Sequence, residues 1–98
     1  PTYNWGYIGK GIMFYERAIE YQDLASKEMD DAKWSELSKK FEESLKSCIA
    51  PFEKAYELST DPEIRRTVSE YLKNACFRFR GESDEYLQKY EKYAAAAE

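Results

Sequence analysis

Apolar side chains recur at steps of three and four residues along the first quarter of the chain. One stripe runs from Trp5 to Ile19, and a second stripe beside it runs from Phe14 to Ala25. This spacing places side chains on one face of a helix. It predicts a first helix over residues 3–28, with an inner face of Trp5, Ile8, Ile12, Tyr15 and Ile19 flanked by Phe14, Ala18, Tyr21 and Ala25. Because this face is broad, we expect the helix to contact more than one neighbour.

The most regular pattern follows and predicts a second helix over residues 31–58. Its apolar positions again lie three or four residues apart: Trp34, Leu37, Phe41, Leu45, Cys48, Phe52 and Ala55. Either Asp30 or Asp31 can cap the first turn. Pro51 lacks the amide that a helix interior needs, but the apolar stripe keeps its phase across it. We therefore predict a kink at Pro51 and no break.

Two shorter helices are predicted after a cluster of capping residues. Thr60 and Glu63 have the spacing of a capping box, while Asp61 can instead be the cap with Pro62 at the first helical position. Both starts give a third helix over residues 62–80, ended by Gly81 in a left-handed conformation. Ser83 opens a fourth helix over residues 83–97. The inner faces predicted for these two helices are Ile64, Val68, Tyr71, Leu72, Ala75, Cys76 and Phe79, then Tyr86, Leu87, Tyr90, Tyr93 and Ala94.

These elements predict an all-α fold in a single domain of 98 residues. Short connections make neighbouring helices antiparallel, which gives two helical hairpins in series. The first hairpin is elongated, and we expect Leu24 and Ala25 on one arm to pack against Trp34 and Leu37 on the other. A plain four-helix bundle and a stack of hairpins both satisfy this pattern.

Composition and charge narrow the function. The net charge of −4 argues against a nucleic-acid partner. No apolar run approaches the roughly 20 residues of a membrane span. The chain has no histidine, so the usual general base and the commonest metal ligand are missing. We therefore predict no catalytic residue, no metal and no cofactor. An enzyme that uses only tyrosines and carboxylates is kept as an alternative to the two hypotheses given at the end of this subsection.

Cysteines and glycines each allow two interpretations. Cys48 and Cys76 are not spaced as zinc ligands, and they are either buried thiols or partners in a disulfide, which would require an oxidising compartment. Gly6, Gly9 and Gly11 could form a phosphate-binding loop, but no strand precedes them. We interpret these glycines as points where helices pack closely.

Helical hairpins in series are typical of repeat proteins, and parts of this sequence have the spacing of a repeat. Cys48, Phe52 and Ala55 have the small-aromatic-small spacing of a second repeat helix, and Asn4-Trp5-Gly6 resembles the Asn-Leu-Gly of a first one. The chain is thus similar to the tetratricopeptide repeat family, in particular to the C-terminal part of bacterial members with an elongated penultimate hairpin. The residues assigned to repeat packing are Trp5, Gly6, Cys48, Phe52, Ala55, Leu72, Cys76, Tyr86 and Tyr90.

The resemblance implies an alpha-alpha superhelix whose first helices form a concave face that binds a peptide or a partner helix. Carried onto this sequence, the groove positions are Tyr3, Tyr7, Lys10, Glu70, Asn74, Phe77 and Arg78. The plainer interpretation is that Tyr3, Tyr7 and Phe77 only cover neighbouring apolar surface. Tyr3 and Tyr7 stand where some family members clamp a carboxylate with Lys and Asn, so we expect aromatic and polar contacts to a partner.

Two functional hypotheses follow from the sequence. The preferred one is a non-catalytic protein–protein interaction scaffold that binds a protein or peptide partner. The alternative is a structural helical module that self-associates through its long hairpin. The chain begins at Pro1 with no initiator methionine or signal-like segment, so we expect it to be part of a longer protein. A periplasmic and a cytoplasmic location both stay open.

Overall fold

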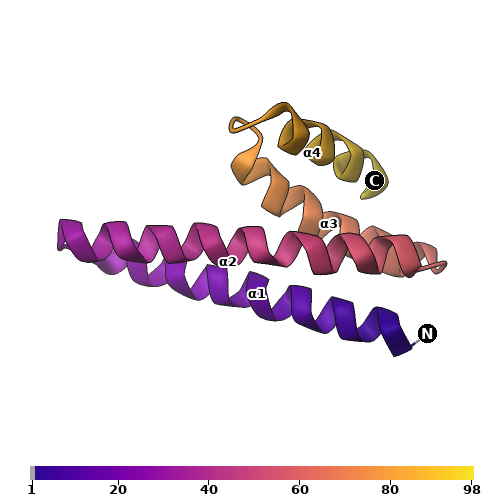
Figure 1. The fold of residues 1–98 in the computed structure, drawn as a ribbon, viewed down its shortest axis with the longest axis horizontal. Helices are drawn as coiled ribbons and strands as arrows, with labels where there is room; N and C mark the ends of the chain where they lie inside the picture. The colour runs from indigo at the N-terminus through magenta and orange to yellow at the C-terminus, as the bar shows by residue number, and fades with distance from the viewer. Residues whose placement is uncertain (1) are drawn as a thin grey trace.

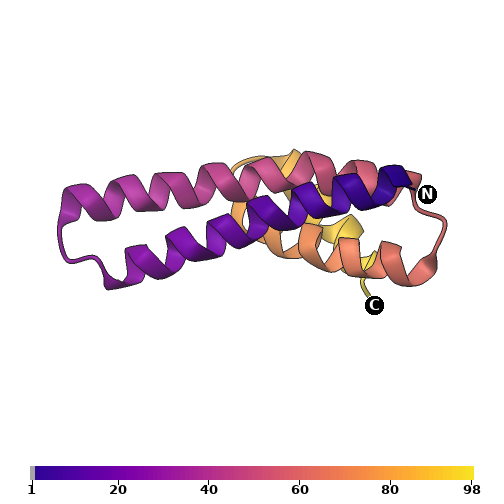
Figure 2. The same ribbon diagram turned by 90° about the horizontal axis from the view of Figure 1, so that it is seen from below.

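A computed structural model describes the backbone of residues 2–98 and the side chains of residues 6–98. The helices are α1 (Thr2–Lys27), α2 (Asp31–Leu58), α3 (Pro62–Phe79) and α4 (Asp84–Ala96), and residues 2–98 contain no strand. Figures 1 and 2 show α1 and α2 as a long antiparallel hairpin, with α3 and α4 as a shorter pair against one half of it. The all-α fold class is therefore confirmed. The predicted groove residue Tyr3 and packing residue Trp5 lie outside the described side chains.

Each helix begins and ends within one residue of its predicted bounds, and short polar side chains cap three of them. Asp30 accepts a hydrogen bond from the Lys33 amide at 2.9 Å, so Asp30 and not Asp31 caps α2. Asp61 accepts from the Glu63 amide at 2.9 Å with Pro62 in the first turn, which is the second of the two predicted starts of α3. Ser83 caps α4.

Pro51 and Gly81 are two positions where the conformational preference of one residue type gave a prediction about a helix. α2 continues through Pro51, so the prediction of one long helix is confirmed. The prediction of a left-handed Gly81 is wrong, because no described glycine has a positive φ. Arg80 keeps helical angles (φ −60°, ψ −23°), and the Glu82 amide donates to the Phe79 carbonyl at 2.9 Å. Right-handed turns thus end α3, and the conformational freedom of the glycine is not used.

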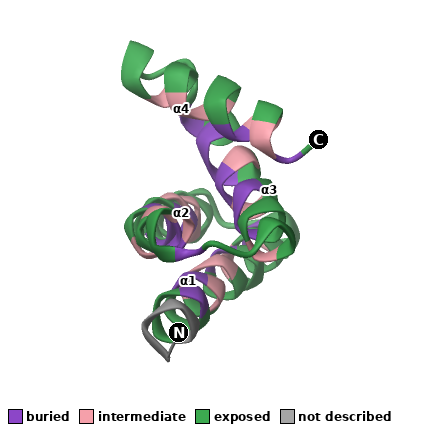
Figure 3. Ribbon diagram, turned by 90° about the vertical axis from the view of Figure 1, so that its right-hand side faces the viewer, coloured by how far each residue is buried: buried purple, intermediate pink, exposed green. Residues whose placement is uncertain are grey.

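The core lies where α3 crosses the half of the first hairpin that contains the end of α2. Burying each large apolar side chain there contributes about 1.5–3 kcal/mol. Figure 3 shows buried positions on the facing sides of the helices. The side chains with 2% or less of their surface exposed are Ala18, Cys48, Phe52, Ala55, Val68, Ser69, Leu72, Ala75, Cys76, Phe79 and Tyr93.

Gly11 is the point where the backbone of α1 lies directly against the Phe52 ring of α2. A Cβ at Gly11 would lie 2.7 Å from two ring atoms of Phe52. The Phe52 ring stacks on Tyr71 with centroids 4.8 Å apart, and Tyr71 meets the edge of Tyr15 at 4.9 Å. The close approach predicted at Gly6 is wrong, since a Cβ there would meet nothing within 4 Å. The Phe52 ring projects onto a later turn of α1, so the contact falls at Gly11.

The far end of the first hairpin is less packed than the sequence predicts. Leu24 and Trp34 were expected to pack across the arm, but they are 51% and 52% exposed. Met29, in the connection between the helices, is 94% exposed. Ala25 is buried and Leu37 is half-buried, so only the innermost positions of the arm are covered. The two arms do shield each other, but on one seam alone.

Two further inner-face predictions are wrong for related reasons. Ile19 is 45% exposed because the last turns of α3 rise away from the first hairpin beside it (Figure 1). Leu87 is 40% exposed because α4 contacts its neighbours through Tyr86, Tyr90 and Tyr93, and Leu87 lies to one side of that stripe. The Ile19 result matters more, since it leaves apolar surface uncovered beside the end of α3.

Candidate functional site

The last turns of α3 rise away from the first hairpin (Figure 1), and a groove lies beside them. Its first part has a volume of about 310 Å³ and lies between α1, α2 and the end of α3, and its second part, of about 660 Å³, continues between α1 and α2. Gln22, Phe41 and Arg78 line both parts, so we treat them as one surface, the arm groove. The other lining residues are Tyr15, Ile19, Ser26, Trp34, Ser35, Ser38, Lys39, Glu42, Leu45, Asn74, Phe77 and Arg80.

The arm groove has an accessible apolar lining. Trp34, Phe77 and Ile19 are 52%, 48% and 45% exposed, and they come from α2, α3 and α1. Phe41 and Leu45 lie buried beneath them. Large exposed apolar side chains from three elements that line adjoining hollows are typical of an interaction surface, whereas scattered exposed apolar residues are ordinary.

Two arginines at the edge of the groove are held against aromatic rings. The guanidinium of Arg80 lies 3.7 Å from the centre of the Phe77 ring, and its Nη1 donates to the Phe77 carbonyl at 2.7 Å. The guanidinium of Arg78 lies 5.7 Å from the Phe41 ring centre, and its Nη2 is 3.5 Å from Oε2 of Glu42. Such cation–π contacts restrict the two side chains while their outer N–H groups face solvent.

The charges of the arm groove are biased toward positive. Its lining contains three cations, Lys39, Arg78 and Arg80, and a single carboxylate, Glu42. The chain as a whole carries a net charge of −4, so the charge of this surface is opposite in sign to that of the chain. The groove therefore combines an apolar floor with a cationic edge.

The opposite face of the same arm differs in charge. A hollow of about 360 Å³ there is lined by Leu24, Glu28, Lys33, Glu36, Leu37 and Lys40. Leu24 and Glu28 lie about half a helical turn from Gln22 and Ser26 of the arm groove, which places this hollow on the other side of α1. Its two lysines balance its two glutamates, so the positive bias belongs to one face only.

The structure brings some of the predicted groove residues together and separates others. Asn74, Phe77 and Arg78 all line the arm groove. The remaining described members of the predicted set are exposed but are not among its lining residues: Tyr7, Lys10 and Glu70. Tyr7 lies about two turns before Tyr15 on α1, next to a separate hollow of about 320 Å³ lined by Ile8, Ile12 and the first turns of α3.

Sequence reasoning missed the α1 and α2 walls of the arm groove. Tyr15, Ile19 and Phe41 were assigned to the core, and Gln22 was not singled out. A signal was present in the predicted lengths: a 28-residue helix paired with a 19-residue one leaves part of the longer helix uncovered. The structure has 28 residues in α2 and 18 in α3, so this part spans several turns.

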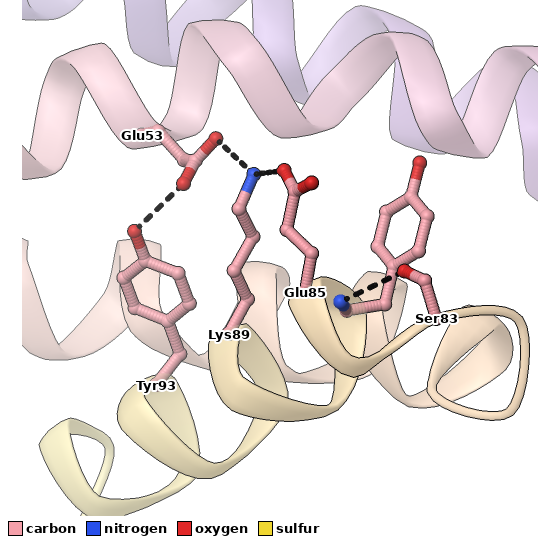
Figure 4. A network of polar contacts seen from close by, with 6 residues as sticks. Glu53, Ser83, Glu85, Lys89 and Tyr93 are labelled. Carbon is pink, nitrogen blue, oxygen red and sulfur yellow. Dashed lines mark hydrogen bonds and ion pairs between the residues drawn. The ribbon is translucent and has the colours of Figure 1, made fainter.

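A second polar cluster joins α4 to α2 (Figure 4). Lys89 Nζ lies 3.2 Å from Glu53 Oε1 and 3.3 Å from Glu85 Oε1, and the Tyr93 hydroxyl donates to Glu53 Oε2 at 3.1 Å. Burial lowers the pKa of Lys89, but the hydrogen bonds and charges of Glu53 and Glu85 outweigh it and raise the pKa above its ordinary value. Burial and Glu53 raise the pKa of Tyr93, which keeps the hydroxyl a donor. The cluster positions α4.

Cys48 and Cys76 are free, buried thiols, which confirms the first of the two interpretations. Burial raises the pKa of Cys48 to about 12 and that of Cys76 to about 11. The thiolate is the reactive form of cysteine, so neither side chain is a competent nucleophile at neutral pH.

Within the described part of the chain, no three His, Cys, Asp or Glu side chains gather as metal ligands would. The described helices also include none with the length and apolar character needed to cross a membrane. Compared with protein-family models, curated proteins and solved structures, the chain gives no significant match.

Proposed function

We propose that this chain is a non-catalytic scaffold for protein–protein interaction and that a partner docks in the arm groove. The observation that carries the proposal is that exposed Ile19, Trp34 and Phe77, from three different helices, line two adjoining hollows that share Gln22, Phe41 and Arg78. Covering such side chains is favourable by about 25 cal/mol for each Å² of apolar surface removed from water. A partner that fills the groove gains this free energy.

The arrangement of the hairpins supports the same function. In a tetratricopeptide-like stack, α1 and α3 would be the first helices of successive repeats, and their shared face would be the binding face. Asn74, Phe77 and Arg78 were predicted on that face and lie together in the arm groove. Tyr7, Lys10 and Glu70 would then contact a longer partner outside the groove.

The side chains of the arm groove also favour binding over catalysis. Glu42 is its single carboxylate, and it pairs with Arg78. General acid–base chemistry commonly uses two groups with different pKa values around a substrate, and the lining residues do not supply such a pair. The proposed role is therefore recognition without turnover.

Affinity capture from cells that express the natural protein tests this function. We expect the wild-type chain to retain a partner and the double variant Ile19→Ser/Phe77→Ser to lose it. The matched control is Met13→Ser/Leu87→Ser, because Met13 and Leu87 are 44% and 40% exposed but do not line the groove. Equal loss in both variants, or in neither, would show that the groove does not bind the partner.

Self-association through the long hairpin is a second candidate, favoured by the exposure of Leu24, Met29 and Trp34 near its tip. The uncovered arm, about 16 Å long and 20 Å wide, would bury only about 650 Å² in total between two copies. Stable interfaces bury at least about 1,200 Å², so such a dimer would be weak. Sedimentation of the chain at concentrations up to about 1 mM decides, because a weak dimer forms in that range: a monomer throughout removes this candidate.

A further inference from the structure

We propose that the occupant of the arm groove is an acidic amphipathic helix of a partner protein, about three turns long. The inference rests on the proposed function and adds the chemistry of the partner. Three observations carry it: the length of the uncovered arm, the cationic edge of the groove, and the engagement of the inner face of α4, which leaves a second copy no free acidic helix to offer.

The length and shape of the occupant follow from where α3 stops covering α2. The last contact between them on this side is the ion pair of Arg78 with Glu42. From Glu42 back to Asp31, α2 continues for eleven residues, which is about 16 Å, or three helical turns. The α2 side of the groove presents side chains at steps of three or four residues: Trp34, Ser38, Phe41 and Leu45. A helix with the same spacing of apolar residues packs on such a floor by fitting ridges into grooves.

The charge of the occupant follows from the two ring-bound arginines. Arg78 and Arg80 lie against the Phe41 and Phe77 rings, so little side-chain freedom is lost when their N–H groups bind a carboxylate. The existing pair of Arg78 with Glu42 is 3.5 Å long and its side chains are 52% and 40% exposed, so it exchanges readily for a partner's carboxylate. With Lys39, three cations face the occupant. A basic helix in the same place would meet like charge.

A second copy of this chain is a poor source for such a helix. α4 carries three carboxylates against two lysines, and two of the carboxylates, Asp84 and Glu85, lie in its first turn. Its apolar face is already used, because Tyr93 is 2% exposed and bound to Glu53 within the same molecule. The other acids lie on α1, α2 and α3, whose apolar faces form the core, or in the connections and at the C-terminal end of the chain. The acidic helix therefore belongs to a different protein.

Two synthetic peptides test the inference on the full chain. Both are fluorescein-labelled 14-residue helices with the same stripe of leucines, and the flanking positions carry glutamates in one and lysines in the other. Fluorescence anisotropy at low salt should give a Kd at least ten times lower for the acidic peptide. The preference should shrink as salt rises, since screening weakens charge contacts at the protein surface.

A matched pair of variants assigns the effect to the groove. Arg78→Gln/Arg80→Gln should weaken binding of the acidic peptide about tenfold. Lys33→Gln/Lys40→Gln removes the same charge from the opposite face of the arm and should change the Kd less than twofold. Circular dichroism of each variant verifies that the helices are intact.

Three results would overturn the inference: equal affinity for both peptides, equal weakening by the two double variants, or no binding of the acidic peptide at millimolar concentration. The proposed function is tested separately, by capture with the serine variants of Ile19 and Phe77. If these variants lose the captured partner although one of the three results above is found, the groove binds proteins whose charge or shape differs from the helix inferred here.

Discussion

Replacing Gly11 with alanine tests the packing of α1 against α2 within the first hairpin. The new Cβ would lie 2.7 Å from the Phe52 ring, whereas ordinary contacts begin at 3.4 Å, so ring or helix must move by about 0.7 Å. The ring cannot swing into solvent, because Phe52 is fully buried and stacked on Tyr71. Overpacking of this kind costs about 1–3 kcal/mol.

Gly9 provides the matched control two residues away on the same helix. A Cβ at Gly9 would meet nothing within 4 Å, so Gly9→Ala gains only the helix propensity of alanine, about 1 kcal/mol. Both substitutions gain the helix propensity of alanine, but only Gly11→Ala brings the new Cβ too close to the Phe52 ring. We therefore expect Gly11→Ala to be less stable than Gly9→Ala by about 1–3 kcal/mol. For a domain of this size the melting temperatures should differ by at least about 4 °C.

Urea unfolding followed by circular dichroism measures the difference directly. A Phe52→Leu background adds a double-mutant cycle, in which the smaller side chain should relieve most of the Gly11→Ala penalty. Equal stability of Gly11→Ala and Gly9→Ala would refute the close approach of α1 and α2 at Phe52. The aromatic series from Phe52 through Tyr71 to Tyr15, a groove residue, would then be misplaced as well.

Three further predictions concern the core and the α4 cluster. Cys48 and Cys76 should not react with Ellman's reagent at pH 8 until denaturant is added, and rapid reaction of either would contradict their burial. The pKa values of the folded thiols, about 12 for Cys48 and about 11 for Cys76, exceed the ordinary 9.0. The free energy of unfolding should therefore be constant below pH 9 and fall as the pH rises toward 11, by about 1.4 kcal/mol per thiol at pH 10. Cys48→Ala/Cys76→Ala should reduce this pH dependence, and an unchanged dependence would exclude the thiols as its cause. Tyr93→Phe should cost about 1 kcal/mol by removing the hydrogen bond to Glu53, and a neutral effect in urea unfolding would show that the bond does not hold α4.

The helices were predictable because their signals are local. Apolar spacing gave the bounds of α2, and the side chains of Asp61 and Ser83 marked the starts of α3 and α4. These signals depend on residues within one or two turns of each other, so they do not need the tertiary structure. The same locality explains the error at Gly81, where right-handed turns satisfied the carbonyl groups at the end of α3 without a left-handed residue.

The groove was only partly predictable, because exposure depends on where a distant helix ends. Phe77 and Arg78 were placed on the binding face by their positions on α3. Ile19 and Trp34 follow the same apolar spacing as buried residues, and spacing alone cannot tell which turns of a long helix a shorter neighbour covers. Gly11 likewise looks like Gly6 and Gly9 in the sequence, because the contact that distinguishes it is made by Phe52 of another helix.

Hydrogen–deuterium exchange of the chain with and without its captured partner tests the central claim, that this protein works by docking a partner in the arm groove. The account predicts slower exchange in residues 15–26, 34–45 and 74–80, which line the groove, with little change in α4. Protection confined to α4, or to the outer turns of α1 around Met13, would contradict it.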